Sequence, residues 1–135
     1  MSTTARALTA LALCTSLGFM TGCLVAAAGA GAGGAVYFTE RGTESVLSAS
    51  VARVFDATRE TFQEQGISET KTSTEQEGAG ERRQLEGAKG DREVTVTIRT
   101  EGSGSKVEVV ARKTPVTWDK DFAKSILESI VAKAG

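Results

Sequence analysis

Two stretches of the chain repeat their apolar side chains with the period of an α-helix. The first carries Val51, Val54, Phe55, Thr58 and Phe62 on one face, and the second carries Phe122, Ile126, Leu127, Ile130 and Val131. Ser48 or Ser50 can cap the start of the first helix, and Gly66 can end it in the left-handed conformation. Asp119 or a neighbour starts the second helix, shortly after Pro115 has ended the preceding strand. Each helix therefore has one apolar face that can pack on a core.

Between these helices the apolar period changes from about 3.6 residues to two, which predicts strands. The clearest strand runs from Arg92 to Glu101, where valine and isoleucine alternate with threonine and arginine, and residues 106–113 alternate in the same way. Residues 102–105 form the loop of that hairpin. Weaker patterns predict strands at 67–74 and 81–88, with turns at 75–80 and 89–91. Before the first helix, residues 36–38 and 42–47 read as one extended segment.

The elements follow one another as strand, helix, four strands and helix. This order predicts an α+β domain in which an antiparallel sheet of about five strands is covered on one face by two helices. The order is similar to the helix-grip arrangement. We expect the polar side chains of the central hairpin to lie on the uncovered face of the sheet, namely Thr95, Thr97, Arg99 and Arg112.

The N-terminus has the pattern of a secretory signal. Arg6 is followed by an uncharged apolar stretch, and Met20-Thr21-Gly22-Cys23 resembles the bacterial lipobox. That resemblance implies cleavage between Gly22 and Cys23, and a diacylglycerol and an N-acyl chain on Cys23. Residues 1–22 would then be the signal peptide, 23–35 a lipidated cysteine with an Ala/Gly-rich tether, and 36–135 a single periplasmic domain. An uncleaved membrane anchor stays open as an alternative, because nothing from Ala7 to Thr39 carries a charge.

Composition removes several kinds of chemistry. The chain has no histidine, and of its two cysteines Cys14 would leave with the signal while Cys23 would be acylated. Catalytic triads and histidine- or thiol-based metal sites therefore lack their side chains, so we expect no enzyme activity, no metal and no cofactor. Glu75, Glu77 and Glu81 lack the spacing of a calcium loop and predict a solvated turn. The balance of 16 basic and 17 acidic residues gives no basic face for nucleic acid.

From Cys23 to its end, the chain resembles a family of small bacterial envelope lipoproteins described only as a domain of unknown function. The shared features are a Gly-Cys followed by an Ala/Gly run, the aromatic pair Tyr37-Phe38, a first helix that ends in Gly66, a hairpin with alternating threonines and an apolar terminal helix. The resemblance implies an envelope location and an α+β fold. It implies no particular activity.

We therefore expect a lipid-anchored protein that faces the periplasm and acts as an interaction or scaffold module for an unidentified envelope protein. Leu24 follows the cysteine where many bacteria place an aspartate to retain lipoproteins in the inner membrane, so the resemblance favours the outer membrane. The alternative is a module that binds a lipid or another apolar ligand in a groove between sheet and helix. Phe55, Phe62, Trp118 and Phe122 would line that groove.

Overall fold

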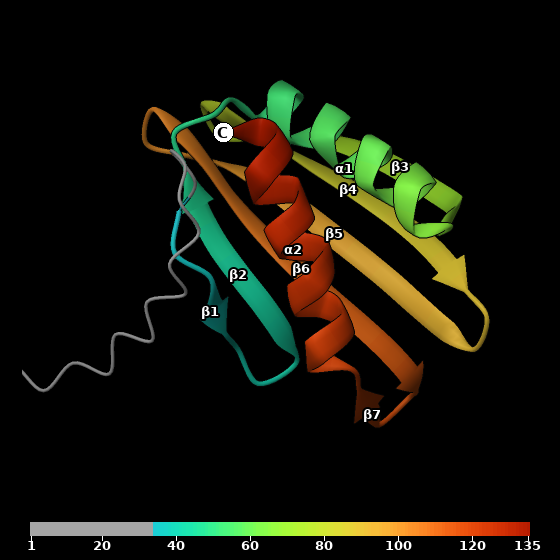
Figure 1. The fold of residues 1–135 in the computed structure, drawn as a ribbon. Coiled ribbons are helices and arrows are strands. Elements are labelled where there is room, and N and C mark those ends of the chain that lie inside the picture. Colours follow the sequence, from blue (N-terminus) through green and yellow to red (C-terminus); the bar gives the residue numbers. More distant parts are fainter. Residues whose placement is uncertain (1–33) are drawn as a thin grey trace, which may run out of the picture.

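A computed structural model describes residues 34–135. The predicted signal peptide, Gly22, Cys23 and nearly all of the tether lie outside the described residues. The strands are β1 (Tyr37–Phe38), β2 (Gly42–Leu47), β3 (Ser68–Glu77), β4 (Gly80–Lys89), β5 (Arg92–Glu101), β6 (Gly104–Thr114) and β7 (Thr117–Trp118), and the helices are α1 (Val51–Gln65) and α2 (Lys120–Ala134). The seven strands form one antiparallel sheet in the order β1-β2-β6-β5-β4-β3, and β7 pairs with β6 (Figure 1).

The predicted α+β class and the two helices on one face of the sheet are confirmed (Figure 1). The five long strands β2 to β6 correspond to the five predicted ones, and β1 and β7 are short additions. The extended segment before α1 is divided, because residues 39–41 form a turn in which the Thr39 amide donates to the Gly42 carbonyl at 2.9 Å. As a result β1 folds back along β2 as its antiparallel partner.

Two hairpin loops are shorter than predicted. β3 continues to Glu77 and β4 begins at Gly80, so the turn is only Gly78 and Ala79 rather than residues 75–80. Likewise β6 begins at Gly104, within the predicted loop. Gly78 and Gly102 have φ of 62° and 57°, the left-handed conformation that a two-residue hairpin turn requires.

The ends of both helices follow the predicted caps. Ser50 caps α1, since its Oγ accepts from the Arg53 amide at 3.3 Å, and Gly66 ends the helix with φ of 67°. Asp119 caps α2 by accepting from the Phe122 amide at 3.0 Å. Among residues 34–135, no helix has both the length and the apolar character needed to cross a bilayer.

The core lies between the helices and one face of the sheet. Its centre is aliphatic and includes Leu85, Val94, Val96, Ile98, Val107, Val109, Ile126, Leu127 and Ile130. The other face carries no helix. Thr95 and Thr97 lie there opposite Val110 and Glu108 of β6, and Arg112 lies opposite Glu93, as the alternation predicts.

Candidate interaction surface

The two phenylalanines of α1 are part of the packed core. Phe55 and Phe62 are both buried, and the sheet approaches Phe62 closely at Gly87. A Cβ atom added to Gly87 would lie 2.7 Å from Phe62 Cε2, so even a methyl group has no space there. These side chains therefore fill the space between α1 and the sheet.

Phe122 and Trp118 lie at either side of the start of α2. Phe122 packs against the edge of the core, with the Arg92 guanidinium 5.1 Å and the Lys89 ammonium 5.7 Å from the centre of its ring. Trp118 instead lies on the uncovered face, where it lines a shallow depression of about 120 Å³ with Glu93, Thr95, Val110 and Arg112. The four predicted groove residues are thus divided between the two faces of the sheet.

The short strand β7 explains why Trp118 lies on the face opposite the helices. Pairing of Trp118 with Arg112 of β6 directs the indole to the face that carries Arg112, away from the helices. A tryptophan one residue before a helix cap can pack on either side of a sheet. The sequence contains no periodic signal over two residues that would decide between them.

Residues 34–135 expose few large apolar side chains. Tyr37, Phe38 and Val116 are 50%, 53% and 84% exposed, and Val46 is the remaining large apolar side chain exposed in this part of the chain. The Arg41 guanidinium lies 5.7 Å from the centre of the Trp118 ring and joins the β1–β2 turn to β7. We refer to Arg41, Val116 and Trp118 as the aromatic corner. Phe38 is not part of it, because it lies across from the buried Thr43 and 5.9 Å from Lys124 Nζ of α2, on the helix-covered face. The aromatic corner lies in the lower half of Figure 1, at the end of the sheet where α2 begins.

Asp119 fixes the position of Trp118 relative to α2. Its carboxylate accepts from the Phe122 amide at 3.0 Å and from Arg92 Nε at 2.8 Å, and Lys113 Nζ lies 3.7 Å away. The hydrogen bond from the Phe122 amide, together with the bond and charge of Arg92 and the charge of Lys113, lowers the pKa of Asp119, although partial burial opposes this shift. Trp118 therefore directly precedes a residue that is bonded to both α2 and β5.

The rest of the uncovered face carries oppositely charged side chains in ion pairs. Lys106 lies 3.0 Å from Glu44, Arg82 lies 3.4 Å from Glu75, and Arg112 pairs with Glu93. Such partly exposed pairs contribute little to stability and keep a sheet face solvated. The apolar side chains of this face include Trp118 and Val110 at one end of the sheet and the half-exposed Val46 of β2.

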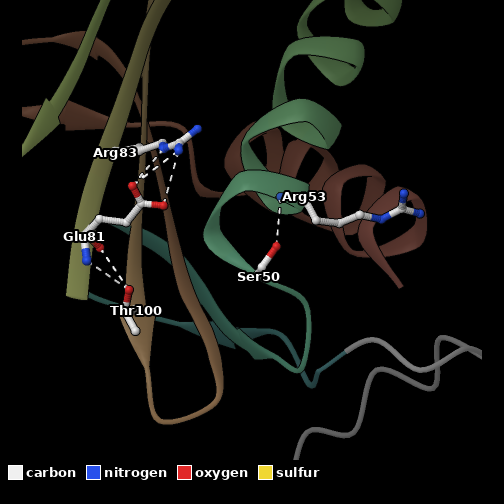
Figure 2. Close-up of polar contacts among 5 residues, drawn as sticks. All are labelled: Ser50, Arg53, Glu81, Arg83 and Thr100. Atoms are coloured by element: carbon white, nitrogen blue, oxygen red, sulfur yellow. Dashed lines mark hydrogen bonds and ion pairs between the residues drawn. The ribbon is translucent and has the colours of Figure 1, made fainter. Parts of the chain in front are cut away.

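The acidic residues predicted to form a solvated turn lie at the opposite end of the sheet. Glu75 forms an ion pair with Arg82. Glu81 forms an ion pair with Arg83 at 3.3 Å (Figure 2). Within residues 34–135 no three His, Cys, Asp or Glu side chains are grouped closely enough to hold a metal ion. Thr100 Oγ1 accepts from the Glu81 amide at 3.0 Å and ties β5 to the start of β4 (Figure 2).

These features define a small α+β domain with one helix-covered face, one solvated face and an aromatic corner. The chain belongs to the family described as "Protein of unknown function (DUF3568)", whose model matches residues 6–133. The match includes the segment that contains Cys23 as well as the whole sheet. No curated protein matches the chain.

Proposed function

We propose that this protein is a lipid-anchored protein of the bacterial cell envelope that works as a non-enzymatic interaction module. In this proposal Cys23 holds the chain at the periplasmic face of the outer membrane, and the aromatic corner binds an envelope protein. The single observation that carries the binding role is the Trp118 ring on the uncovered face, with the Arg41 guanidinium over it and the 84% exposed Val116 two residues away in the chain. The lipobox-like Met20-Thr21-Gly22-Cys23 carries the anchoring role.

The chemistry of the aromatic corner suits a protein partner. Tryptophan, tyrosine and arginine are the side chains most enriched at the energetic centres of protein interfaces. Here the Arg41 guanidinium lies over the Trp118 ring, and Val116 is 84% exposed. A partner that covered these side chains would remove apolar surface from water, and each buried Å² contributes roughly 25 cal/mol.

The position of this surface is compatible with anchoring. Gly34, the first described residue, lies against Val46 near one end of β2, whereas Arg41 precedes Gly42 at the other end. Four residues of strand separate the two ends by about 14 Å. A tether that leaves at Gly34 therefore leaves Arg41, Val116 and Trp118 accessible on the side remote from the anchor.

A ligand groove between sheet and helices receives less support. It would need space beside Phe55 and Phe62 of α1, and both side chains are buried, with Gly87 of β4 directly against Phe62. We therefore place the binding role on the outer surface.

The anchoring role is tested by acylation and cleavage of the full-length chain. Wild-type chain should incorporate labelled palmitate and fractionate with the outer membrane, and globomycin should cause the uncleaved precursor to accumulate. Cys23→Ala should lose the label, while Cys14→Ala serves as the matched control and should behave as wild type. Retention of an unlabelled, uncleaved chain in the membrane would instead establish the uncleaved-anchor alternative.

The binding role is tested by photo-crosslinking in intact cells. A photoreactive phenylalanine at Val116 should give a discrete adduct with an envelope protein, and Trp118→Ala should abolish that adduct. The same probe at Gln76, an exposed position on β3, is the control and should give none. Equal adducts from both positions, or no adduct from Val116, would show that the aromatic corner is not the binding surface.

A further inference from the structure

The two edges of the sheet have opposite characters. At one edge, β3 is exposed along nearly all of its ten residues, carries four charged side chains (Glu69, Lys71, Glu75 and Glu77) and is interrupted by a bulge between Glu69 and Lys71. Charges and bulges on an edge strand prevent other strands from pairing with it. At the other edge, the segment from Gly34 to Thr39 contains no charge. The β1 edge therefore lacks the protection that β3 has.

β1 is also too short to pair with the whole of β2. Its two residues pair Tyr37 with Glu44 and Phe38 with Thr43, whereas β2 has six residues. Beside the remaining part of β2 the chain at residues 34–36 forms no strand. A longer strand in the place of β1 could pair along the full edge.

Two buried hydroxyl groups on β2, the strand that pairs with β1, lack hydrogen-bond partners among the described residues. Five polar side chains are buried among residues 34–135, and three of their hydroxyls are bonded: Thr58 to the Val54 carbonyl, Thr61 to the Ala57 carbonyl and Ser105 to the Ala49 carbonyl. The other two are Thr43 and Ser45, both on β2, whose hydroxyls have no partner among the described residues. A buried hydroxyl without a partner is destabilising, and most buried polar groups in proteins are bonded.

β1 is unable to supply the missing bond. Phe38 lies directly across from Thr43 and presents an aromatic ring, which is itself 53% exposed. The backbone of Gly34 closes over Ser45, since a Cβ atom at Gly34 would lie 2.7 Å from Ser45 Oγ. β1 thus leaves the Phe38 ring half exposed, with Lys124 Nζ of α2 5.9 Å from its centre, and leaves the hydroxyls of β2 unpaired.

We infer that β1 is a replaceable strand, and that β2 accepts in its place an extended segment of the partner protein with a hydroxyl or amide side chain across from Thr43. Such a segment would gain backbone hydrogen bonds along β2, the usual source of affinity in strand addition, and would bond the hydroxyl of Thr43. The inference rests on the proposed function, because it names the kind of partner that the aromatic corner receives. It commits to an uncharged extended peptide, in accordance with the uncharged segment that it replaces.

The test uses two peptides with the full-length chain in detergent micelles. The first probe has the sequence of residues 34–39, acetylated and amidated, and the second has the same sequence with Phe38→Thr. On titration, NMR should show shifts of the β2 amides and faster hydrogen exchange of the Tyr37 and Phe38 amides. The threonine peptide should bind about fivefold more tightly than the native sequence, the effect of one added hydrogen bond.

A double-mutant cycle separates the contribution of the hydrogen bond from non-specific binding of the peptide. In the Thr43→Val variant, the threonine peptide should lose its advantage over the native peptide. In a Tyr37→Cys/Glu44→Cys chain, the disulfide should hold β1 in place and prevent binding of both peptides, and reduction should restore binding. Tyr37→Cys alone is the matched control.

Several outcomes would overturn the inference. They are an absence of β2 shifts at millimolar peptide, an equal preference in wild type and Thr43→Val, or undiminished binding to the disulfide-locked chain. A concentration-dependent dimer without peptide, lost in the locked chain, would show that a second copy of the chain occupies β2 instead. Adducts from Val116 that persist in any of these cases would leave the proposed function standing without the replaceable strand.

Discussion

Replacement of Asp119 tests how the aromatic corner is held. Asp119→Ala removes the cap of α2 and the ionic partner of Arg92 in one step, because the same carboxylate accepts from the Phe122 amide at 3.0 Å and from Arg92 Nε at 2.8 Å. Trp118 is the neighbouring residue and the only tryptophan in the chain. Its fluorescence therefore reports on this junction without a label.

The expected loss follows from two contributions. Loss of an N-cap aspartate costs about 1 kcal/mol. The bond to Arg92 adds about 1 kcal/mol, a reduced value for a charge-assisted bond because the Asp119 side chain is 15% exposed and that of Arg92 is 34% exposed. Asp119→Ala should therefore lower the free energy of unfolding by about 2 kcal/mol, and Asp119→Asn, which keeps a capping oxygen, by about 1 kcal/mol.

The pH dependence has a defined sign. The folded pKa of Asp119 lies below its value in the unfolded chain, so its ionisation stabilises the fold fully above the unfolded pKa, near 4. That stabilisation is lost as the pH falls from there through the folded pKa. The stability difference between wild type and Asp119→Asn should therefore shrink on acidification. Urea unfolding followed by Trp118 fluorescence at pH 7 and at pH 3 measures it.

Two results would refute this account. A loss below about 0.5 kcal/mol for Asp119→Ala would mean that the cap and the ion pair contribute no more than an exposed surface contact. Equal losses for Asp119→Ala and Asp119→Asn, unchanged at pH 3, would mean that the carboxylate charge has no role.

The same unfolding measurement checks three further predictions. Gly87→Ala should destabilise the fold by about 2 kcal/mol, because its Cβ would lie 2.7 Å from both Phe62 Cε2 and Ile67 Cγ2; no loss would mean that the sheet moves away freely. Ile126→Ala should cost about 3 kcal/mol at its fully buried site, and a cost under 1 would contradict the core packing. Thr43→Val should be neutral or stabilising by up to about 1 kcal/mol, whereas a clear loss would reveal a hidden partner of its hydroxyl.

The helices and the central hairpin could be predicted because their signals are local. Phe55 and Phe62 lie on one apolar stripe that ends at Gly66, and both are buried in the structure. Val94, Val96 and Ile98 alternate with polar residues and are buried as that pattern predicts. In these elements the spacing of the apolar side chains predicts which face is buried.

The strand ends and the split of the first extended segment had no such signal. Residues 75–77 are polar because both faces of β3 are exposed there, so a strand and a loop have the same composition. The turn at residues 39–41 contains neither glycine nor proline, the residues that usually mark a reversal of the chain. The glycine that helps to close it, Gly42, is already the first residue of β2.

The aromatic corner depends on long-range pairing, which a local pattern does not contain. β2 pairs with β6, more than fifty residues later, and this pairing makes β1 an edge strand and brings Arg41 close to Trp118. The sequence indicated Tyr37 and Phe38 only as an aromatic pair near the tether. Their exposure, and the position of Trp118 on the uncovered face, follow from the order of strands in the sheet.

The edge position of β1 links the proposed membrane anchoring to the proposed replacement of β1 by a partner strand. The segment from Gly34 to Phe38 continues directly from the predicted tether and also closes the edge of β2. A partner strand that replaced β1 would free about five residues of chain, which span up to about 17 Å when extended. The tether would lengthen by that amount, and the domain would gain distance from the membrane as it bound. Binding of the partner and attachment to the membrane would therefore be coupled through the same five residues, and the disulfide between positions 37 and 44 would uncouple them.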